Sequence, residues 1–175
     1  MPSMVASAES SDSLATTGQW NAVALTKFRA PRVRRDVLTR VALLDRLSKS
    51  IDDNPVTLVC APGGSGKTTL LAQWMVDSPM SLTALWITID ADDNDINRLF
   101  GALIQSLAPL ELTWETDPRS LVDSVAGSKA QMRAALAALV NALCTSVAPR
   151  IVLILDDLHP IWRSEERRVG KECRS

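Results

Sequence analysis

The sequence predicts an α/β fold with a parallel sheet and flanking helices, and three observations support this. Short apolar segments with the composition of buried strands occur three times and alternate with amphipathic helical segments. A glycine-rich turn follows the first of these segments, and two aspartates end the third. The chain has 175 residues, of which 46% are hydrophobic and 22% charged, which is typical of one soluble globular domain.

The first half of the chain contains two expected helices and two expected strands. A helix is predicted over about residues 36–50, where apolar residues recur on one side: Val37, Val41, Leu44 and Leu47. The segment "VTLVC" at 56–60 has the composition of a strand buried on both faces. A helix over about 66–76 and a second buried strand over 82–90 follow it.

The second half completes the alternation. The pattern over 92–109 predicts an amphipathic helix, with Asn94 or Asp95 as its N-cap. One or two helices are expected over 118–147, with an apolar stripe formed by Met132, Leu136, Leu139, Val140 and Leu143. A third buried strand is expected over 150–157.

The bulk properties exclude several classes of protein. A net charge of −1 gives no overall attraction to nucleic acid or to a membrane surface, and no run of about 18 apolar residues could span a membrane. The three cysteines lack disulfide or zinc spacing, which indicates free thiols in a reducing, cytoplasmic compartment. Residues 1–24 have no signal-peptide pattern and are expected to form a disordered tail.

A basic segment precedes the first expected strand. Its prolines and arginines predict an extended arm, and a run of this kind is usually a solvated surface rather than a nucleic-acid contact. The basic residues are Lys27, Arg29, Arg32, Arg34, Arg35, Arg40 and Arg46.

The turn after the first strand, "APGGSGKTT", has the pattern of a phosphate-binding loop, or Walker A motif. Its backbone N–H groups can point at a phosphate, and the start of the following helix adds about half a positive charge. Lys67 would reach the β- and γ-phosphates, Thr68 would coordinate Mg²⁺ and Thr69 would contact the α-phosphate. The motif therefore predicts a site for ATP and Mg²⁺ formed by Pro62, Gly63, Gly64, Ser65, Gly66, Lys67, Thr68 and Thr69.

Ala61 stands where this pattern usually has its first glycine. It lies at the exit of the expected strand, upstream of the amides that would surround the phosphate, and an extended backbone there does not require glycine. The substitution is therefore expected to cost the site little.

The third strand ends in Asp156 and Asp157, a Walker B pattern. Ligands bind at the carboxyl edge of the sheet in open α/β folds, so both carboxylates are candidate site residues. Asp156 would hold Mg²⁺ through water, and Asp157 would polarise the attacking water, so that Asp157 and Lys67 are the candidate catalytic residues. His159, the single histidine, is expected to be a structural or sensing residue rather than a metal ligand.

These motifs together resemble a known family. The segments "APGGSGKTTLLAQW", "LWITIDADDNDINRLFGALI" and "LILDDLH" look like the N-terminal ATPase of large LuxR-type transcriptional regulators of the maltose-activator class. That class belongs to the STAND group of signalling P-loop ATPases. The resemblance covers about residues 25–161 and includes Trp74, Trp86, Asp90, Asp93, Asn94, Asp95, Phe100, Asp156, Asp157 and His159.

The resemblance implies an ATP-driven switch with slow hydrolysis. In such a parent protein, ATP and an inducer would promote self-association, and a C-terminal helix-turn-helix would then bind DNA. The chain itself contains no recognisable DNA-binding module. The segment from Val37 to Arg40 would lie near the adenine.

The family pattern ends near residue 162. Residues 163–175, "RSEERRVGKECRS", resemble the translation of a sequencing adapter and are expected to be non-native, which leaves 25–162 as the N-terminal part of the ATPase domain. Proteins of this group resemble one another in the sheet order 5-1-4-3-2, so a fold truncated after the third core strand would lack the strand between its first and third. We therefore expect the isolated chain to fold poorly or aggregate and to have negligible ATPase activity.

Two other functions fit a P-loop. A small P-loop kinase acting on a metabolite would need a lid with arginines and an acceptor pocket after the third strand, and a motor or transport ATPase would need an arginine finger or signature loop. Neither feature is recognisable in the sequence. The leading interpretation is therefore the ATP-binding portion of a regulator. The sequence also lacks the guanine-specificity motif N-K-x-D.

Overall fold

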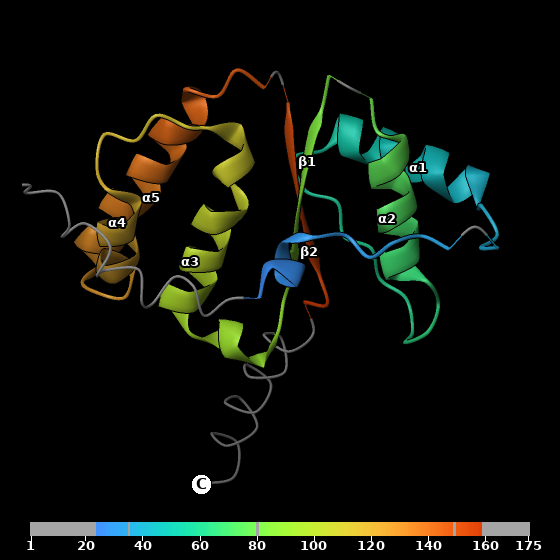
Figure 1. Cartoon of the computed structure of the whole chain (residues 1–175), viewed down its shortest axis with the longest axis horizontal. Helices are drawn as coiled ribbons and strands as arrows, with labels where there is room; N and C mark the ends of the chain where they lie inside the picture. The colour runs from blue at the N-terminus through green and yellow to red at the C-terminus, as the bar shows by residue number, and fades with distance from the viewer. Residues whose placement is uncertain (1–23, 35, 80, 149, 159–175) are drawn as a thin grey trace, which may run out of the picture.

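The computed structural model describes residues 24–34, 36–79, 81–148 and 150–158. At its centre lies a two-stranded parallel sheet formed by β1 (Thr83–Thr88) and β2 (Ile151–Asp156), with Thr83 opposite Ile151 and Thr88 opposite Asp156. Figure 1 shows this sheet edge-on between two groups of helices. The predicted second and third strands and the α/β class are confirmed. His159, residues 1–23 of the predicted tail, and 163–175 lie outside the described residues.

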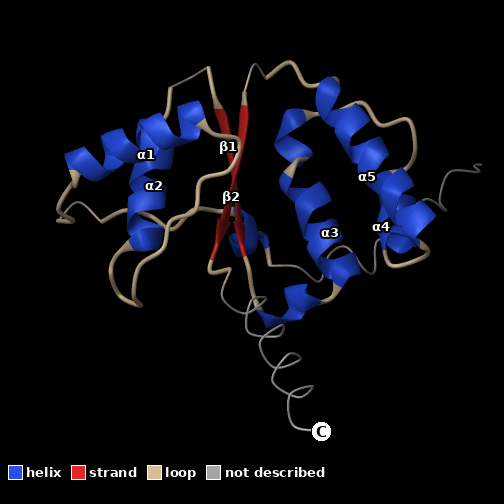
Figure 2. Ribbon diagram, turned by 180° about the vertical axis from the view of Figure 1, so that it is seen from behind, coloured by secondary structure: helices blue, strands red, loops and turns tan. Residues whose placement is uncertain are grey.

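Two helices cover one face of the sheet, α1 (Val41–Asp53) and α2 (Lys67–Asp77) (Figure 2). Their contact with the sheet is a cluster of buried side chains that contains Leu47, Trp74, Trp86 and Ile154. The indole N–H of Trp74 donates to the Ser48 hydroxyl at 3.0 Å, which ties α2 to α1. This layer positions the start of α2, where the phosphate-binding loop ends.

Three helices cover the opposite face, α3 (Ile96–Ser106), α4 (Pro118–Val125) and α5 (Lys129–Cys144). Short 3-10 turns, η3 (Ala91–Asn94) and η4 (Ala108–Leu110), stand before and after α3. The second core lies here and includes Leu85, Phe100, Leu107, Leu121, Val125 and Leu139. Because neighbouring strand residues point to opposite faces, Leu85 joins this core while Trp86 joins the other.

The helix over residues 92–109 is confirmed with a shorter length, since η3 occupies its expected first turn. Of the two predicted N-caps, Asp95 is the one used, and its carboxylate accepts a hydrogen bond from the Arg98 N–H at 3.0 Å. The region 118–147 forms two helices, but the predicted stripe is partly wrong. Leu136 and Val140 are exposed, whereas small residues on the neighbouring face, Ala135 and Ala142, are buried.

The predicted start of the first helix is also wrong, because α1 begins at Val41 rather than near residue 36. Before α1, the part of the arm that the structure describes contains one regular element, the 3-10 turn η2 (Leu25–Phe28). The segment before α1 is held by tertiary contacts instead: Arg40 donates to the Ser65 carbonyl at 3.1 Å. Such a contact can override a helical periodicity of a few residues.

The predicted first strand, 56–60, does not form a strand. Within the described residues, β2 has β1 as its single neighbour, so residues 56–60 have no strand beside them with which to exchange backbone hydrogen bonds. Val56 is 82% exposed and Leu58 is 73% exposed, although Val59 still packs against the cluster that contains Trp74. The arrangement agrees with a sheet order in which the first and third strands are not adjacent.

Among the described helices, none combines the length and the apolar character that crossing a membrane would require.

The exposed apolar segment and the free edge of β2 predict self-association. Unpaired strand edges and exposed apolar side chains pair with other chains, so the protein should show concentration-dependent association by size-exclusion chromatography with light scattering. Leu58→Lys should reduce this association and change the free energy of unfolding by less than about 0.5 kcal/mol. Val76→Lys, at a similarly exposed position on α2, serves as the control and should not reduce it. A monomeric wild type at all concentrations would contradict the prediction.

Candidate nucleotide-binding site

The phosphate-binding loop has the backbone geometry that its glycines allow. Gly64 and Gly66 adopt φ angles of +75° and +88°, in the left-handed region that strains other residues. A Cβ atom added at either position would meet no atom within 4 Å, so the loop borders open space. Helix α2 begins directly after Gly66, and its first N–H groups have no partner within the helix. The Ser65 N–H donates to the Pro62 carbonyl at 3.3 Å, which closes the turn of the loop. The loop and the positive end of the α2 dipole therefore lie together beside open space.

Lys67 folds back over this loop. Its ammonium group donates to the Ala61 carbonyl at 2.8 Å and to the Pro62 carbonyl at 3.1 Å. Both acceptors are neutral backbone oxygens, and an anion would form stronger, charge-assisted hydrogen bonds with the same ammonium group. The contact with residue 61 uses its backbone carbonyl, which alanine supplies as well as glycine would.

Thr68 and Asp156 lie together although they are 88 residues apart in the chain. The Thr68 hydroxyl donates to the Asp156 carboxylate at 3.0 Å. Burial raises the pKa of Asp156 above its usual value, and the nearby charge of Asp157 adds to this, while the hydrogen bond from Thr68 opposes it. The pair joins the first turn of α2 to the carboxyl end of β2, as the Walker A and Walker B motifs predict.

The donor set at this point suits Mg²⁺. In the described part of the chain, no group of three or more His, Cys, Asp and Glu side chains could hold a metal by itself. Mg²⁺ commonly binds through one or two protein oxygens, several waters and the phosphates of a ligand, so one hydroxyl and one carboxylate are enough. Thr68 and Asp156 therefore fit a magnesium ion that arrives with a nucleotide.

Asp157 follows β2 with an exposed side chain and a backbone φ of +58°. Left-handed conformations are uncommon for residues other than glycine, although aspartate tolerates them better than most. Non-glycine residues held in this region cluster at functional sites, where the surrounding structure supports the strain. The turn places the two strand-end aspartates in different environments, Asp156 buried and Asp157 exposed.

Val37 and Arg40, which the family resemblance implies to lie near the adenine, are beside the loop. They line a pocket of about 200 Å³ together with Leu38 of the arm and with Gly66, Thr69 and Gln73. Arg40 also holds the loop directly through the Ser65 carbonyl. A larger hollow of about 560 Å³ lies near Trp114 between α3 and α4, but it contains none of the predicted site residues.

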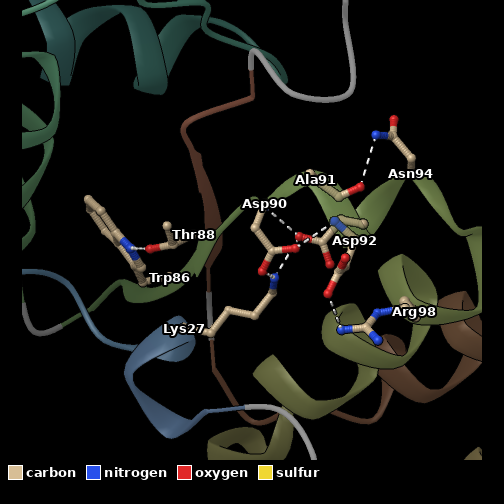
Figure 3. A network of polar contacts seen from close by, with 9 residues as sticks. Lys27, Trp86, Thr88, Asp90, Ala91, Asp92, Asn94 and Arg98 are labelled. Carbon is tan, nitrogen blue, oxygen red and sulfur yellow. Dashed lines mark hydrogen bonds and ion pairs between the residues drawn. The ribbon is translucent and has the colours of Figure 1, made fainter. Parts of the chain in front are cut away.

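The arm is fixed at its other end by a buried ion pair (Figure 3). The Lys27 ammonium group lies 2.5 Å from an Asp90 carboxylate oxygen and 2.6 Å from an Asp93 oxygen. Asp93 is 3% exposed, so its charge depends on this partner. Burial by itself lowers the pKa of Lys27, but the hydrogen bonds to Asp90 and Asp93 outweigh it and leave that pKa raised. The hydrogen bond from Lys27 likewise lowers the pKa of Asp90.

Most of the predicted site residues therefore share one region, at the start of α2, the end of β2 and the arm. Sequence reasoning missed two features, the ion pair of Lys27 and the presence of Gln73 in the pocket. A single polar residue within the otherwise apolar run of residues 70–76, four positions after Thr69, was a signal for the second. The ion pair had no comparable signal, because its partners lie more than 60 residues from Lys27.

The parallel sheet, the loop at the start of α2 and the paired aspartates at the end of β2 define a P-loop nucleotide-binding domain of the α/β class. The family model described as "AAA ATPase domain" matches residues 33–168, which is most of the chain. The chain belongs to this family.

Two curated relatives match the chain over 82 and 137 residues. The chain is 34% identical over 82 residues to the HTH-type transcriptional regulator MalT of Vibrio campbellii, which covers 47% of this chain and 9% of that protein. It is 28% identical over 137 residues to the serine/threonine-protein kinase PknK of Mycobacterium tuberculosis, covering 78% of this chain and 12% of PknK. The chain thus spans about a tenth of the length of these relatives. The chain is a P-loop ATPase region that is similar in sequence to part of MalT.

Removing the Lys27 cation should destabilise the fold, because the buried Asp93 carboxylate would keep its hydrogen bond from the Asp90 N–H but lose its countercharge. We expect Lys27→Met to lower the free energy of unfolding by about 2–3 kcal/mol at pH 7, measured by urea denaturation. Since Lys27 lowers the pKa of Asp90, this stabilisation is present above pH 3.8 and is lost as the pH falls through the folded-state value. The difference between variant and wild type should therefore be constant near neutral pH and shrink below about pH 4. Because the pKa of Lys27 is raised, the difference should also shrink as the pH rises above 10.5.

Arg98→Met is the matched control for Lys27→Met. Arg98 forms an ion pair at 3.1 Å with Asp92, which lies in η3 next to Asp93. Both side chains of this pair are more than half exposed (Figure 3). Its loss should cost less than about 0.5 kcal/mol. Equal costs for the two variants would show that the Lys27 cluster behaves as an ordinary surface pair.

Asp156→Asn should stabilise the nucleotide-free protein and weaken metal-dependent binding. The amide oxygen can still accept the Thr68 hydrogen bond, while the buried negative charge is removed. We expect Tm to rise by about 2 °C at pH 7. Because the folded-state pKa of Asp156 is raised, the wild type should lose stability as the pH rises from 3.8 through that value, and the variant should not.

Differential scanning fluorimetry between pH 4 and 8, and ATP titrations with Mg²⁺ or EDTA, measure both effects. Asp123→Asn, at an exposed position on α4, is the control and should behave as wild type. A lower Tm for Asp156→Asn, or an undiminished gain in ATP affinity on adding Mg²⁺, would contradict this assignment of Asp156.

Proposed function

We propose that this chain is the ATP-binding part of a LuxR-type transcriptional regulator, in which ATP and slow hydrolysis operate a switch. The observation that carries the proposal is the contact between Thr68 and Asp156, which joins a phosphate-binding loop to the end of a parallel strand. The Thr68 hydroxyl and the Asp156 carboxylate offer oxygen ligands for a cation. The backbone amides of the loop and the Lys67 ammonium group, which lie beside them, suit a phosphate chain.

Each residue has a separate part in this proposal. Lys67 exchanges its two carbonyl partners for the β- and γ-phosphates, and the amides of residues 63–68 hold the phosphate oxygens. Thr68 and Asp156 would hold Mg²⁺, which would supply positive charge to stabilise the phosphate chain. Thr69 contacts the α-phosphate, and the pocket beside Val37 and Arg40 takes the base.

Asp157 is proposed to orient and polarise the attacking water, since its side chain is exposed beside the buried Asp156. Hydrolysis is slow in this proposal and resets the switch rather than supplying a product. Nucleotide binding is therefore the better readout for the isolated chain, whose turnover is expected to be negligible.

The regulatory role rests on similarity to the HTH-type transcriptional regulator MalT. In the parent protein we propose an inducer-binding region, self-association promoted by ATP and inducer, DNA binding through a helix-turn-helix, and a cytoplasmic location. Residues 25–162 would be the N-terminal part of the ATPase domain of that parent, and 163–175 a non-native tail. A stand-alone P-loop kinase remains the second reading, and longer sequence after residue 162 would separate the two.

Lys67→Ala tests the nucleotide site directly. Loss of charge-assisted hydrogen bonds to two phosphates should weaken ATP binding by about 10- to 100-fold, measured with a fluorescent ATP analogue at low protein concentration. Lys49→Ala, an exposed lysine on α1, is the matched control and should bind as wild type. Equal affinity of wild type and Lys67→Ala would reject the proposed site.

A further inference from the structure

Gln73 is a buried polar residue whose side chain has no partner. It lies on α2 and is 8% exposed, so more than nine-tenths of it is buried. In the part of the chain that the structure describes, its amide makes no hydrogen bond, whereas the buried amides and carboxylates of folded proteins are normally paired. Neither amide atom of Gln73 is among the fully buried unpaired atoms of the described residues, so the residue is buried while its amide stays accessible from the pocket that it lines.

The position of Gln73 relates it to the phosphate-binding loop. Gly66, Thr69 and Gln73 are spaced three and four residues apart, so they lie on one face of α2. That face forms one wall of the 200 Å³ pocket, and Val37, Leu38 and Arg40 form the other. The arm continues into α1 on the side of the sheet that carries α2 (Figure 1). Gln73 thus lies about one helical turn beyond Thr69, farther from the phosphate loop.

The pocket has the size and lining for a flat ring rather than a whole nucleotide. Its volume is below the roughly 300–1,000 Å³ of pockets that enclose drug-sized ligands. Apolar groups of Val37 and Leu38 can cover the faces of a ring, while the Gln73 amide offers one donor and one acceptor at its edge. A partner that satisfies both must present an acceptor and a donor side by side.

We propose that the Gln73 amide is a specificity-determining group that binds the edge of an adenine base; this rests on the proposed function of the site. The amide oxygen accepts from the 6-amino group, and the amide N–H donates to N7, a bidentate pairing that glutamine makes with adenine elsewhere. Guanine presents two acceptors, O6 and N7, on the same edge. The Gln73 oxygen would then face O6 without a hydrogen, so a guanine nucleotide loses one bond and gains a repulsive contact.

The test compares four nucleotides, ATP, GTP, ITP and 7-deaza-ATP, by competition against a fluorescent ATP analogue on the full 175-residue chain. The wild type should bind ATP about tenfold or more tightly than GTP and ITP, and 7-deaza-ATP should also bind about tenfold more weakly because it lacks the N7 acceptor. In Gln73→Leu, which keeps a similar volume, the four affinities should fall within about threefold of one another. Gln105→Leu, a half-buried glutamine on α3, is the control and should keep the wild-type order.

Two kinds of failure are distinguishable. Binding that depends on Lys67 but shows an unchanged ATP-to-GTP ratio in Gln73→Leu, or equal wild-type affinities for ATP and 7-deaza-ATP, overturns the role of Gln73 and leaves the proposed nucleotide site in place. The 7-deaza-ATP comparison needs no variant, so a folding defect in Gln73→Leu cannot hide the answer. Absence of any Lys67-dependent binding rejects the proposed function and this inference with it.

Discussion

The parallel pairing of β1 with β2 is the constraint on which the site depends. The register that sets Thr88 opposite Asp156 fixes where β2 ends, and that end meets the first turn of α2 through the Thr68 hydroxyl. Strand β1 is covered on both faces, with Leu85 on the α3 side and Trp86 on the α2 side. Since every helix that carries a site residue packs on this small sheet, a slip in its register would separate the loop from the aspartates.

The basic arm adds a second constraint, because it is held at both ends. Lys27 is fixed by two carboxylates of the turn after β1, and Arg40 is fixed by the phosphate-binding loop. The buried Asp93 makes the first contact costly to break, whereas the exposed Arg40 contact is a single hydrogen bond to a carbonyl. The arm is therefore anchored firmly near β1 and more weakly near the pocket that Val37 and Leu38 line.

The same sheet also explains the weakest part of the fold. Residues 56–60 carry the composition of a buried strand, yet Val56 and Leu58 face solvent, because no described strand lies beside them. A segment with the composition of a strand forms one only when a neighbouring strand exchanges backbone hydrogen bonds with it and other elements cover its side chains. The phosphate-binding loop that follows is nevertheless formed, since its geometry depends on local glycines and on the start of α2.

Local chemistry, which the sequence by itself determines, accounts for the class of fold and the loop. Glycines at 64 and 66 allow left-handed backbone, Lys67 and Thr68 follow at the helix start, and apolar runs mark the two paired strands. Asp95, one of the two N-caps that the sequence predicts, caps α3. These features depend on residues close together in the chain, where periodicity and capping rules apply.

Contacts between residues that are distant in the sequence, and the burial that results from them, depend on the tertiary structure. It shortened α1 because Arg40 contacts the loop, left residues 56–60 without a strand partner, and buried Ala135 and Ala142 of α5 in place of Leu136 and Val140. It also brought Lys27 to Asp93 and set Gln73 unpaired in a pocket beside the loop. Such outcomes follow from burial and from contacts between separate segments, which no local pattern encodes.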